Sequence, residues 1–338
     1  MTSPSHGEDL VFESRRAHIS IRLVSEIDFS HKIQERKKFL QVPEQDKTMQ
    51  ITPSIHALRH SFKIPITPGV AIDRFVYSFI IYGEMITLID TGVAGCDAPI
   101  FDYIRATDRD PSEIALIVLT HSHPDHIGAA RAIQQATGCS IAAHHAERAW
   151  IEDVELQNRE RPVPGFATLT GGSVHIDNEL VEGDSIEPDD TRAGEMQVFY
   201  TPGHSAGSIS LFLHREGALF SGDVVPVAGD LPVYDDALLS VRSVKKLKAI
   251  RGIQVLLSSW DEPRNGDDAY QRMDLALDYL QQIHQAVLAS ADDGDLMELT
   301  GKAATVLGLP PQAVNPLLSR TFAANLRVRE RKNLLSDS

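Results

Sequence analysis

The residues best suited to chemistry lie in one short stretch of the sequence. Four potential metal ligands fall within six positions, namely His121, His123, Asp125 and His126. Imidazole nitrogens and carboxylate oxygens are ligands that suit Zn²⁺ and similar first-row metals. A metal held there would lower the pKa of a bound water molecule and supply hydroxide for attack on a carbonyl or phosphoryl centre. Asp125 could accept a proton or steer the attacking hydroxide.

The sequence around these ligands predicts how they are held. An apolar run, residues 115–119, precedes them, which indicates a buried strand, a tight loop after Thr120 and a helix from Ile127. Side chains alternate along an extended chain, so His121 and His123 should point to the same side, while the next two ligands can face a second centre. The alternative is a polar loop of solvated histidines. Four ligands this dense at a strand end argue against it.

Three further motifs place polar residues at predicted strand ends. His204 follows a Pro-Gly turn between two strands, where it could supply a fifth ligand. Asp223 follows Ser221-Gly222, and glycine permits a close backbone approach. Asp90 precedes Thr91-Gly92 and could orient a metal-ligating histidine through a hydrogen bond. As an alternative, Asp90 could be an ordinary cap or turn residue.

Apolar periodicity predicts an α+β protein with a helical C-terminal part. We expect an N-terminal extension over residues 1–48, a domain over 49–265 and a helical region over 266–338. Residues 152–178 should form an irregular loop or short helices that could cover a site. The predicted strands are 51–62, 77–82, 86–89, 115–119, 140–143, 180–186, 196–200, 209–213, 218–220 and 254–257. The predicted helices are 98–106, 129–137, 146–151, 240–250, 267–292, 296–307 and 314–326.

The composition limits the classes of partner and the cellular compartment that we expect for this protein. The 338 residues carry 47 acidic and 32 basic side chains, a formal charge of −15, which argues against nucleic acid as a partner. The sequence has no apolar run long enough to predict a membrane span, and the N-terminus does not resemble a signal peptide. Two cysteines fit a reducing cytoplasm rather than a disulfide scaffold. We therefore expect a cytoplasmic protein with a small-molecule substrate, and a homo-oligomer is compatible with the sequence.

The motifs resemble those of the metallo-β-lactamase superfamily over roughly residues 49–265. The resemblance rests on His-Ser-His-Pro-Asp-His at 121–126, Pro-Gly-His at 202–204, Gly-Asp at 222–223 and Asp-Thr-Gly at 90–92. It implies an αββα sandwich with a C-terminal helical extension, and one or two Zn²⁺ ions per chain, with iron also compatible. By this resemblance the first metal is bound by His121, His123 and His204. The second is bound by Asp125 and His126. Asp223 would bridge the two metals, and Asp90 would orient a metal ligand without binding the metal itself.

The sequence departs from the family pattern at one position. The hydrolases usually carry a further histidine at the end of the last strand, as a ligand of the second metal. This neighbourhood reads Ser258-Ser259-Trp260-Asp261, so Trp260 stands in place of the histidine. An indole ring offers no lone pair to a metal. Either Asp261 or a water molecule would have to complete the second site.

The resemblance implies a metal-dependent hydrolase of a small ester, thioester or lactone, similar to hydroxyacylglutathione hydrolases and lactonases. Asp125 would be its catalytic residue, and Tyr234 could reach the pocket or simply pack in the core. A second hypothesis is a persulfide dioxygenase with a single iron, because loss of the last histidine would suit a mononuclear centre. A third is a non-catalytic metal-binding module, motivated by the altered segment at 258–261.

Overall fold

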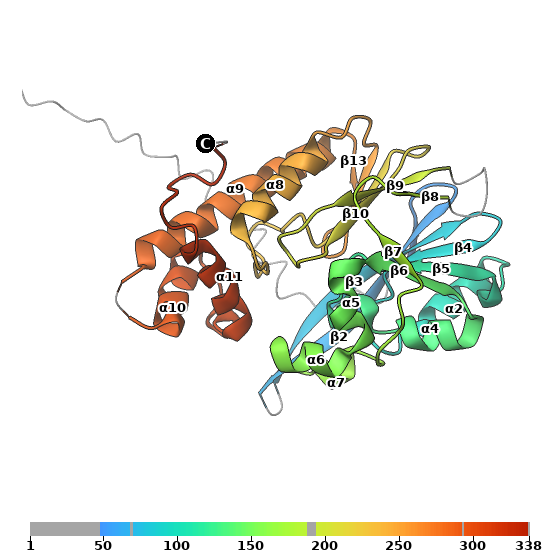
Figure 1. The fold of residues 1–338 in the computed structure, drawn as a ribbon, viewed down its shortest axis with the longest axis horizontal. Helices are drawn as coiled ribbons and strands as arrows, with labels where there is room; N and C mark the ends of the chain where they lie inside the picture. The colour runs from blue at the N-terminus through green and yellow to red at the C-terminus, as the bar shows by residue number, and fades with distance from the viewer. Residues whose placement is uncertain (1–47, 68–69, 188–193, 293, 337–338) are drawn as a thin grey trace, which may run out of the picture. The chain divides into compact units, whose positions relative to one another are not determined.

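Two β-sheets form the centre of the protein (Figure 1). The computed structural model describes residues 48–67, 70–187, 194–292 and 294–336. The first sheet has seven strands in chain order, antiparallel from β1 to β4 and parallel from β4 to β7. Its strands are β1 (Thr48–Gln50), β2 (Ile55–Thr67), β3 (Val70–Tyr82), β4 (Ile86–Ile89), β5 (Ile114–Val118), β6 (Ser140–His144) and β7 (Asn178–Leu180).

The second sheet has six strands in the order β13-β12-β11-β10-β9-β8. Only the β11–β12 pair is parallel among these strands of the described chain. The strands are β8 (Ser185–Ile186), β9 (Met196–Tyr200), β10 (Ile209–Leu213), β11 (Ala218–Gly222), β12 (Val255–Ser258) and β13 (Arg264–Asn265).

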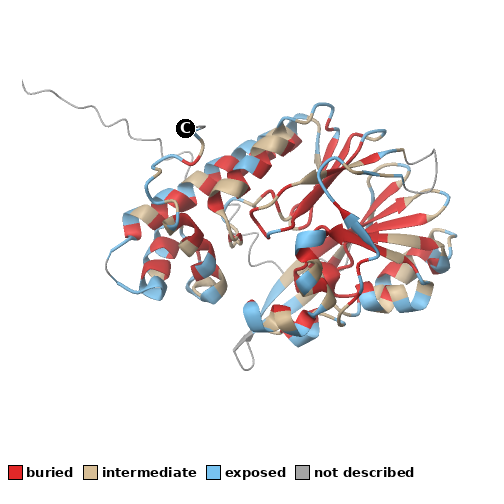
Figure 2. Ribbon diagram, viewed as in Figure 1, coloured by how far each residue is buried: buried red, intermediate tan, exposed pale blue. Residues whose placement is uncertain are grey.

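The sheets pack face to face because alternate residues of their strands are apolar. Tyr77, Phe79 and Ile81 of β3 share one buried cluster with the alternate residues of β10 and β11, whereas Ile80 belongs to the cluster on the opposite face. Phe79 and Phe220 meet edge to face across the sheets, with ring centroids 5.3 Å apart. Figure 2 shows much of the strand ribbon in red, the colour of buried residues. Successive side chains of a strand point to opposite faces, so one set faces the other sheet and the next set faces the helices that cover the outer side.

Helices cover the outer face of each sheet and complete an αββα sandwich. The first sheet is covered by a cluster that includes Ile100, Ile104 and Ile133 of its helices. These helices are α2 (Asp97–Ala106), α3 (Pro124–Ile127), α4 (Ala130–Thr137), α5 (Arg148–Glu152), α6 (Val154–Glu160) and α7 (Phe166–Leu169). The second sheet packs against the C-terminal helices, namely α8 (Ala237–Lys248), α9 (Asp267–Ser290), α10 (Leu296–Val306) and α11 (Pro316–Leu326).

Local signals explain where several helices begin and end. Gly138 ends α4 in the left-handed conformation that glycine favours. The side chain of Asp236 accepts a hydrogen bond from the Leu239 amide and so caps α8. Asn315 caps α11 in the same way, with Pro316 at its first position. Within the described residues, none of the helices combines the length and apolar character that crossing a membrane requires.

The predicted fold class is confirmed, but some local predictions are wrong. The strands β2 and β3 form a hairpin 13 residues long on each side, well beyond the predicted 51–62 and 77–82, and Lys63 pairs with Asp73 across it. The predicted strand 180–186 is two strands, because the chain turns between β7 of one sheet and β8 of the other. The predicted extension 1–48 lies almost wholly outside the described residues, and the domain boundaries stay predictions.

The strand ends that matter for function meet at one edge of the sandwich. Parallel β4 and β5 end side by side, just before Asp90 and Thr120. The Ile209 amide at the start of β10 donates to the Thr120 carbonyl at 3.0 Å, which joins the loops of the two sheets. The Tyr77 amide likewise donates to the Ser259 carbonyl at 2.9 Å, beyond the end of β12. Loops from both sheets therefore converge on a single site.

Candidate metal centre

Three histidines from two loops converge on one point. The Nε2 atom of His204 lies 2.8 Å from Nδ1 of His123 and 3.2 Å from Nε2 of His121. Nε2 of His121 and Nδ1 of His123 are 3.0 Å apart. A carboxylate oxygen of Asp223 lies 3.3 Å from His204 Nε2, and all four ligand atoms lie within 4.8 Å of one another. All four residues were singled out from the sequence.

Hydrogen bonds on the far side of two rings decide which nitrogen carries the proton. Nδ1 of His204 faces the Val233 carbonyl at 2.6 Å, and a carbonyl can only accept, so this nitrogen is the donor. The Thr120 hydroxyl donates to Asp90 and is therefore free to accept from Nδ1 of His121 at 3.0 Å. Both Nε2 atoms are thus left with lone pairs directed into the site.

Lone pairs this close repel one another unless a cation lies between them. Ligand atoms around a tetrahedral zinc, about 2.0–2.1 Å from the metal, are roughly 3.3 Å apart. The observed separations of 2.8–3.2 Å are near that value. Burial lowers the pKa of His121 and His123 well below its ordinary value and also lowers that of His204, which favours neutral imidazoles. The donor set therefore fits a divalent metal ion.

Asp223 connects this cluster to a second set of polar atoms. Its Oδ1 atom lies 3.3 Å from Nε2 of His126, and that nitrogen lies 3.4 Å from the Asp125 carboxylate. Both His126 Nε2 and Asp223 Oδ1 are buried without a hydrogen-bond partner. Burial lowers the pKa of His126, but the charges of Asp223, Asp125 and Asp90 outweigh it and raise that pKa well above its ordinary value. These carboxylates create a place for positive charge, whether a proton or a second metal.

Asp90 fixes the ligand loop through three hydrogen bonds. Its carboxylate accepts from the Thr120 amide, the Thr120 hydroxyl and Nδ1 of His126, each at 2.8 Å. The residue has φ +56°, a conformation that asparagine and aspartate tolerate better than most side chains. Two glycines allow equally close approaches nearby. A Cβ on Gly203, where φ is +134°, would lie 2.4 Å from the Ser240 amide nitrogen, and one on Gly222 would lie 2.9 Å from the Thr120 hydroxyl.

The side chains of the segment after β12 do not have the arrangement expected of a metal ligand. The indole N–H of Trp260 donates to Asp223 Oδ2 at 2.9 Å, so the tryptophan contacts the carboxylate expected to bridge the metals. Arg74 lies over its ring, 4.3 Å from the centroid. Asp261 points elsewhere, because its carboxylate accepts from Arg264 and Arg272, each at 2.7 Å at its shortest.

Tyr234 lies in the core between the second sheet and the C-terminal helices. It is 3% exposed, and its hydroxyl accepts a hydrogen bond from the Asn325 amide at 2.8 Å. Burial raises its pKa above the ordinary value for tyrosine. Its backbone neighbour Val233 contacts His204, so the tyrosine supports the site through the chain rather than through its hydroxyl.

Glu147 is a component of the site that the sequence did not reveal. This buried carboxylate accepts from the Ser122 amide and hydroxyl, between two of the histidine ligands. It also accepts from the Ser205 hydroxyl at 2.6 Å and the Gly207 amide at 2.5 Å, just after His204. A Cβ on Gly207 would lie 2.7 Å from the Glu147 side chain, so glycine is required there. The only local signal is an acidic residue shortly after a predicted strand.

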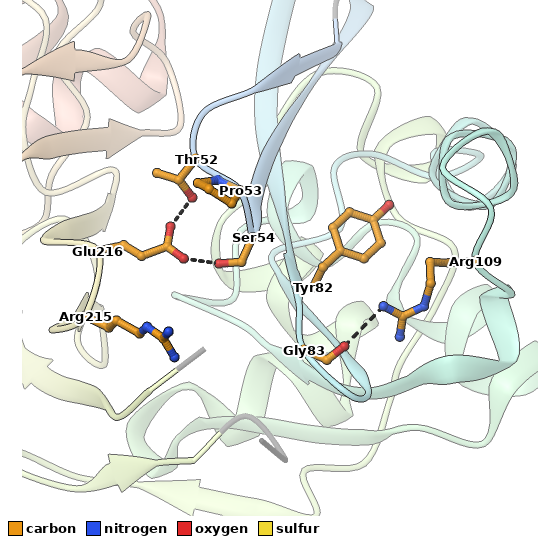
Figure 3. Close-up of a pocket in the computed structure, with 8 residues that line it drawn as sticks. All are labelled: Thr52, Pro53, Ser54, Tyr82, Gly83, Arg109, Arg215 and Glu216. Carbon is orange, nitrogen blue, oxygen red and sulfur yellow. Dashed lines mark hydrogen bonds between the residues drawn. The ribbon is translucent and has the colours of Figure 1, made fainter. Parts of the chain in front are cut away.

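A separate hollow lies at the opposite edge of the sandwich. Thr52, Ser54 and Tyr82 line it together with Arg109, Arg215 and Glu216 of nearby turns (Figure 3). The Glu216 carboxylate accepts from both hydroxyls, and Arg109 donates to the Gly83 and Glu84 carbonyls. Its polar groups are used to join turns, and the hollow contributes nothing to the histidine cluster.

Comparisons with known proteins agree on one family. A family model described as the metallo-beta-lactamase superfamily matches residues 71–293. A probable metallo-hydrolase, YqgX of Bacillus subtilis (strain 168), is 30% identical over 150 residues, which are 44% of this chain and 64% of that protein. A hydroxyacylglutathione hydrolase of Bdellovibrio bacteriovorus is 31% identical over 137 residues, or 40% of this chain and 42% of that protein. The chain thus spans less than two thirds of the length of these relatives.

A solved structure shares the fold over most of its length. The metallo-beta-lactamase family protein TTHA1429 from Thermus thermophilus superposes with a TM-score of 0.63 at 20% identity. The match covers 82% of this chain and 95% of that one. At this identity the likeness supports the fold alone.

Proposed function

This chain belongs to the metallo-beta-lactamase superfamily, and from that premise we propose that it is a metal-dependent hydrolase of a small ester, thioester or lactone. The observation that carries the proposal is the convergence of three neutral imidazole nitrogens and one carboxylate at a single point. A buried cluster of this composition is costly to fold unless a cation joins it.

The proposal gives each residue a role. His121, His123, His204 and Asp223 hold the first ion. A divalent metal held by these residues would lower the pKa of a bound water molecule and polarise a substrate carbonyl. Asp125, whose side chain is 15% exposed, would accept a proton there. Asp90 fixes the ring orientation of His126 through its hydrogen bond to Nδ1.

The substrate class is proposed from a relative and from the surroundings of the site. The Bdellovibrio protein is named a hydroxyacylglutathione hydrolase, which supports a thioester as one candidate. The short helices within residues 152–178 reach the metal loop, since Gln157 of α6 donates to the Ser122 carbonyl at 2.7 Å. We expect these helices to shape the acyl pocket, as the sequence indicated.

A substrate panel tests the proposal directly. Purified protein is stripped of metal with a chelator, reloaded separately with Zn²⁺ or Fe²⁺, and assayed against phenyl esters, acyl thioesters and lactones. Hydrolysis of one class that disappears on stripping and returns on reloading is the expected result. A protein that binds metal fully yet hydrolyses none of the three classes would not be such a hydrolase, which would leave the non-catalytic metal-binding module and the persulfide dioxygenase.

A second candidate function is a mononuclear iron persulfide dioxygenase. Trp260 supports it, because this residue offers no lone pair to a second metal and donates its N–H to Asp223. Oxygen uptake by the Fe²⁺-loaded protein in the presence of glutathione persulfide, with no ester hydrolysis in the zinc form, would select this function over hydrolysis.

A further inference from the structure

Arg161 stands out because it is a buried cation that has no ion-pair partner among the residues that the structure describes. The residue follows α6 and is 6% exposed. Its Nε atom is buried and has no hydrogen-bond partner, and no carboxylate of the described residues forms an ion pair with the guanidinium. Arginine and lysine are almost never fully buried unless they are paired. A buried guanidinium of this kind therefore calls for a partner that the described residues do not supply.

The position of α6 places Arg161 beside the metal centre. Gln157 lies one helical turn earlier, as the 2.7 Å bond from the Arg161 amide to its carbonyl confirms. Arg161 caps the C-terminus of α6, so it follows directly on the turn that carries Gln157. The Gln157 side chain donates to the Ser122 carbonyl, between two histidine ligands, and its Oε1 atom is buried without a partner. The last turn of α6 and the residue that caps it thus bring an unpaired acceptor, Gln157 Oε1, and an unpaired donor, Arg161 Nε, to the metal loop.

The electrostatic interactions of Arg161 agree with a place beside the metal centre. After burial, the charge of Arg161 is the largest influence that lowers the pKa of His123. Burial lowers the pKa of Arg161 itself to about 10, so the side chain remains a cation at neutral pH. Among charged groups, Asp235 raises the pKa of Arg161 most, Asp125 and Asp223 also raise it, and Arg320 lowers it. Asp235 already accepts two hydrogen bonds from Arg320, whereas Asp125 and Asp223 belong to the metal cluster.

We propose that Arg161 binds an anionic group of the substrate, a carboxylate or a phosphate, a few bonds from the scissile carbonyl. This assignment rests on the proposed hydrolysis and deepens it by naming the substrate class. Arginine presents a planar fork of donors that matches a carboxylate or phosphate in two-point contact. An anion beside the metal would supply the partner that the buried guanidinium lacks, and it would fix the acyl group for attack.

Matched substrates and variants test the assignment. Metal-loaded wild type, Arg161→Met, Arg161→Lys and the control Arg159→Met are assayed with phenyl hydrogen succinate, its neutral methyl ester and phenyl phosphonoacetate. Arg159 is a suitable control because it lies two residues earlier, in the last turn of α6, with its side chain 65% exposed. Arg161→Met should lower kcat/KM for the anionic esters by about 10- to 100-fold, the value of a lost charge-assisted hydrogen bond. The neutral ester should change by less than about threefold, and the control should match wild type. The anionic ester that loses more identifies the preferred group.

A second measurement separates a binding role from a structural one. Replacing an unpaired buried charge with an apolar side chain of similar length is often neutral or stabilising. The Tm of Arg161→Met should therefore equal or exceed that of wild type, and its Kd for free succinate or inorganic phosphate, measured by calorimetry, should rise. Equal losses on charged and neutral esters, or a lower Tm with unchanged Kd, would overturn the proposal. If wild type hydrolyses no ester, the proposed hydrolysis fails, and the two anion Kd values still decide the role of Arg161.

Discussion

Replacing Glu147 by glutamine should weaken metal binding although this residue is not a ligand. The carboxylate is 3% exposed and accepts four hydrogen bonds, two from the loop of His121 and His123 and two from the loop after His204. It therefore fixes the distance between the two loops that must meet at the metal. Glutamine keeps the shape but offers only one oxygen, so one loop must face the amide N–H₂ group.

The size of the effect follows from that lost pairing. The released loop leaves one buried backbone N–H unsatisfied, which costs about 1–3 kcal/mol. The free energy of unfolding of metal-free Glu147→Gln should therefore fall by about 2 kcal/mol. Residues that orient metal ligands typically contribute 10- to 100-fold in metal affinity or activity. We expect the metal dissociation constant to rise by about that factor.

The assay measures both quantities in the same samples. Urea unfolding of metal-free protein gives the change in stability, and competition with a chromophoric chelator gives the metal affinity. The control is Glu152→Gln in α5, because Glu152 accepts from the Ile176 amide at 3.0 Å and contacts neither ligand loop. The control should lose stability and keep its metal affinity. If Glu147→Gln loses stability as the control does but keeps its metal affinity, the positioning role is refuted.

Three other substitutions separate the remaining parts of the site. Asp125→Asn should lower kcat by about 10²–10⁴-fold with an unchanged circular dichroism spectrum, and turnover within a few-fold of wild type would contradict its role in proton transfer. Trp260→His should raise the number of metal ions retained per chain during mild chelation, and an unchanged number would show that position 260 does not reach the second site. Asp261→Ala should reduce the free energy of unfolding by about 3 kcal/mol by leaving Arg272 unpaired. Its metal content should match wild type, and loss of metal would make Asp261 a ligand after all.

The sequence predicted the parts of the fold that local chemistry determines. The strands 86–89, 196–200 and 209–213 have the predicted bounds, because short apolar runs flanked by turn residues leave few alternatives. The hairpin of β2 and β3 extends further because charged residues such as Lys63 alternate across an exposed ribbon, where apolar spacing gives no signal. The helix after the ligand loop begins at Pro124 rather than Ile127, so Asp125 and His126 lie in its first turn.

The candidate ligands could be predicted because histidines and aspartates at successive strand ends must meet when those strands lie side by side. The residues around them could not. Glu147 reaches partners 25 to 60 positions away, and nothing in its own neighbourhood distinguishes it from a surface glutamate. The roles of Arg161 and Trp260 likewise depend on the folded chain, which buries the first and brings the second to Asp223. The Trp260–Asp223 bond, for example, links residues 37 positions apart.

The most direct test of the account is a count of metal per chain. Elemental analysis of wild type and His123→Ala, purified in parallel, should find about one zinc or iron ion or more in wild type and less than about a tenth of an ion in the variant. Far-UV circular dichroism should be the same for both, because the imidazole is a ligand and not part of the core. Equal metal content in the two proteins would contradict the central claim that His121, His123, His204 and Asp223 hold one ion.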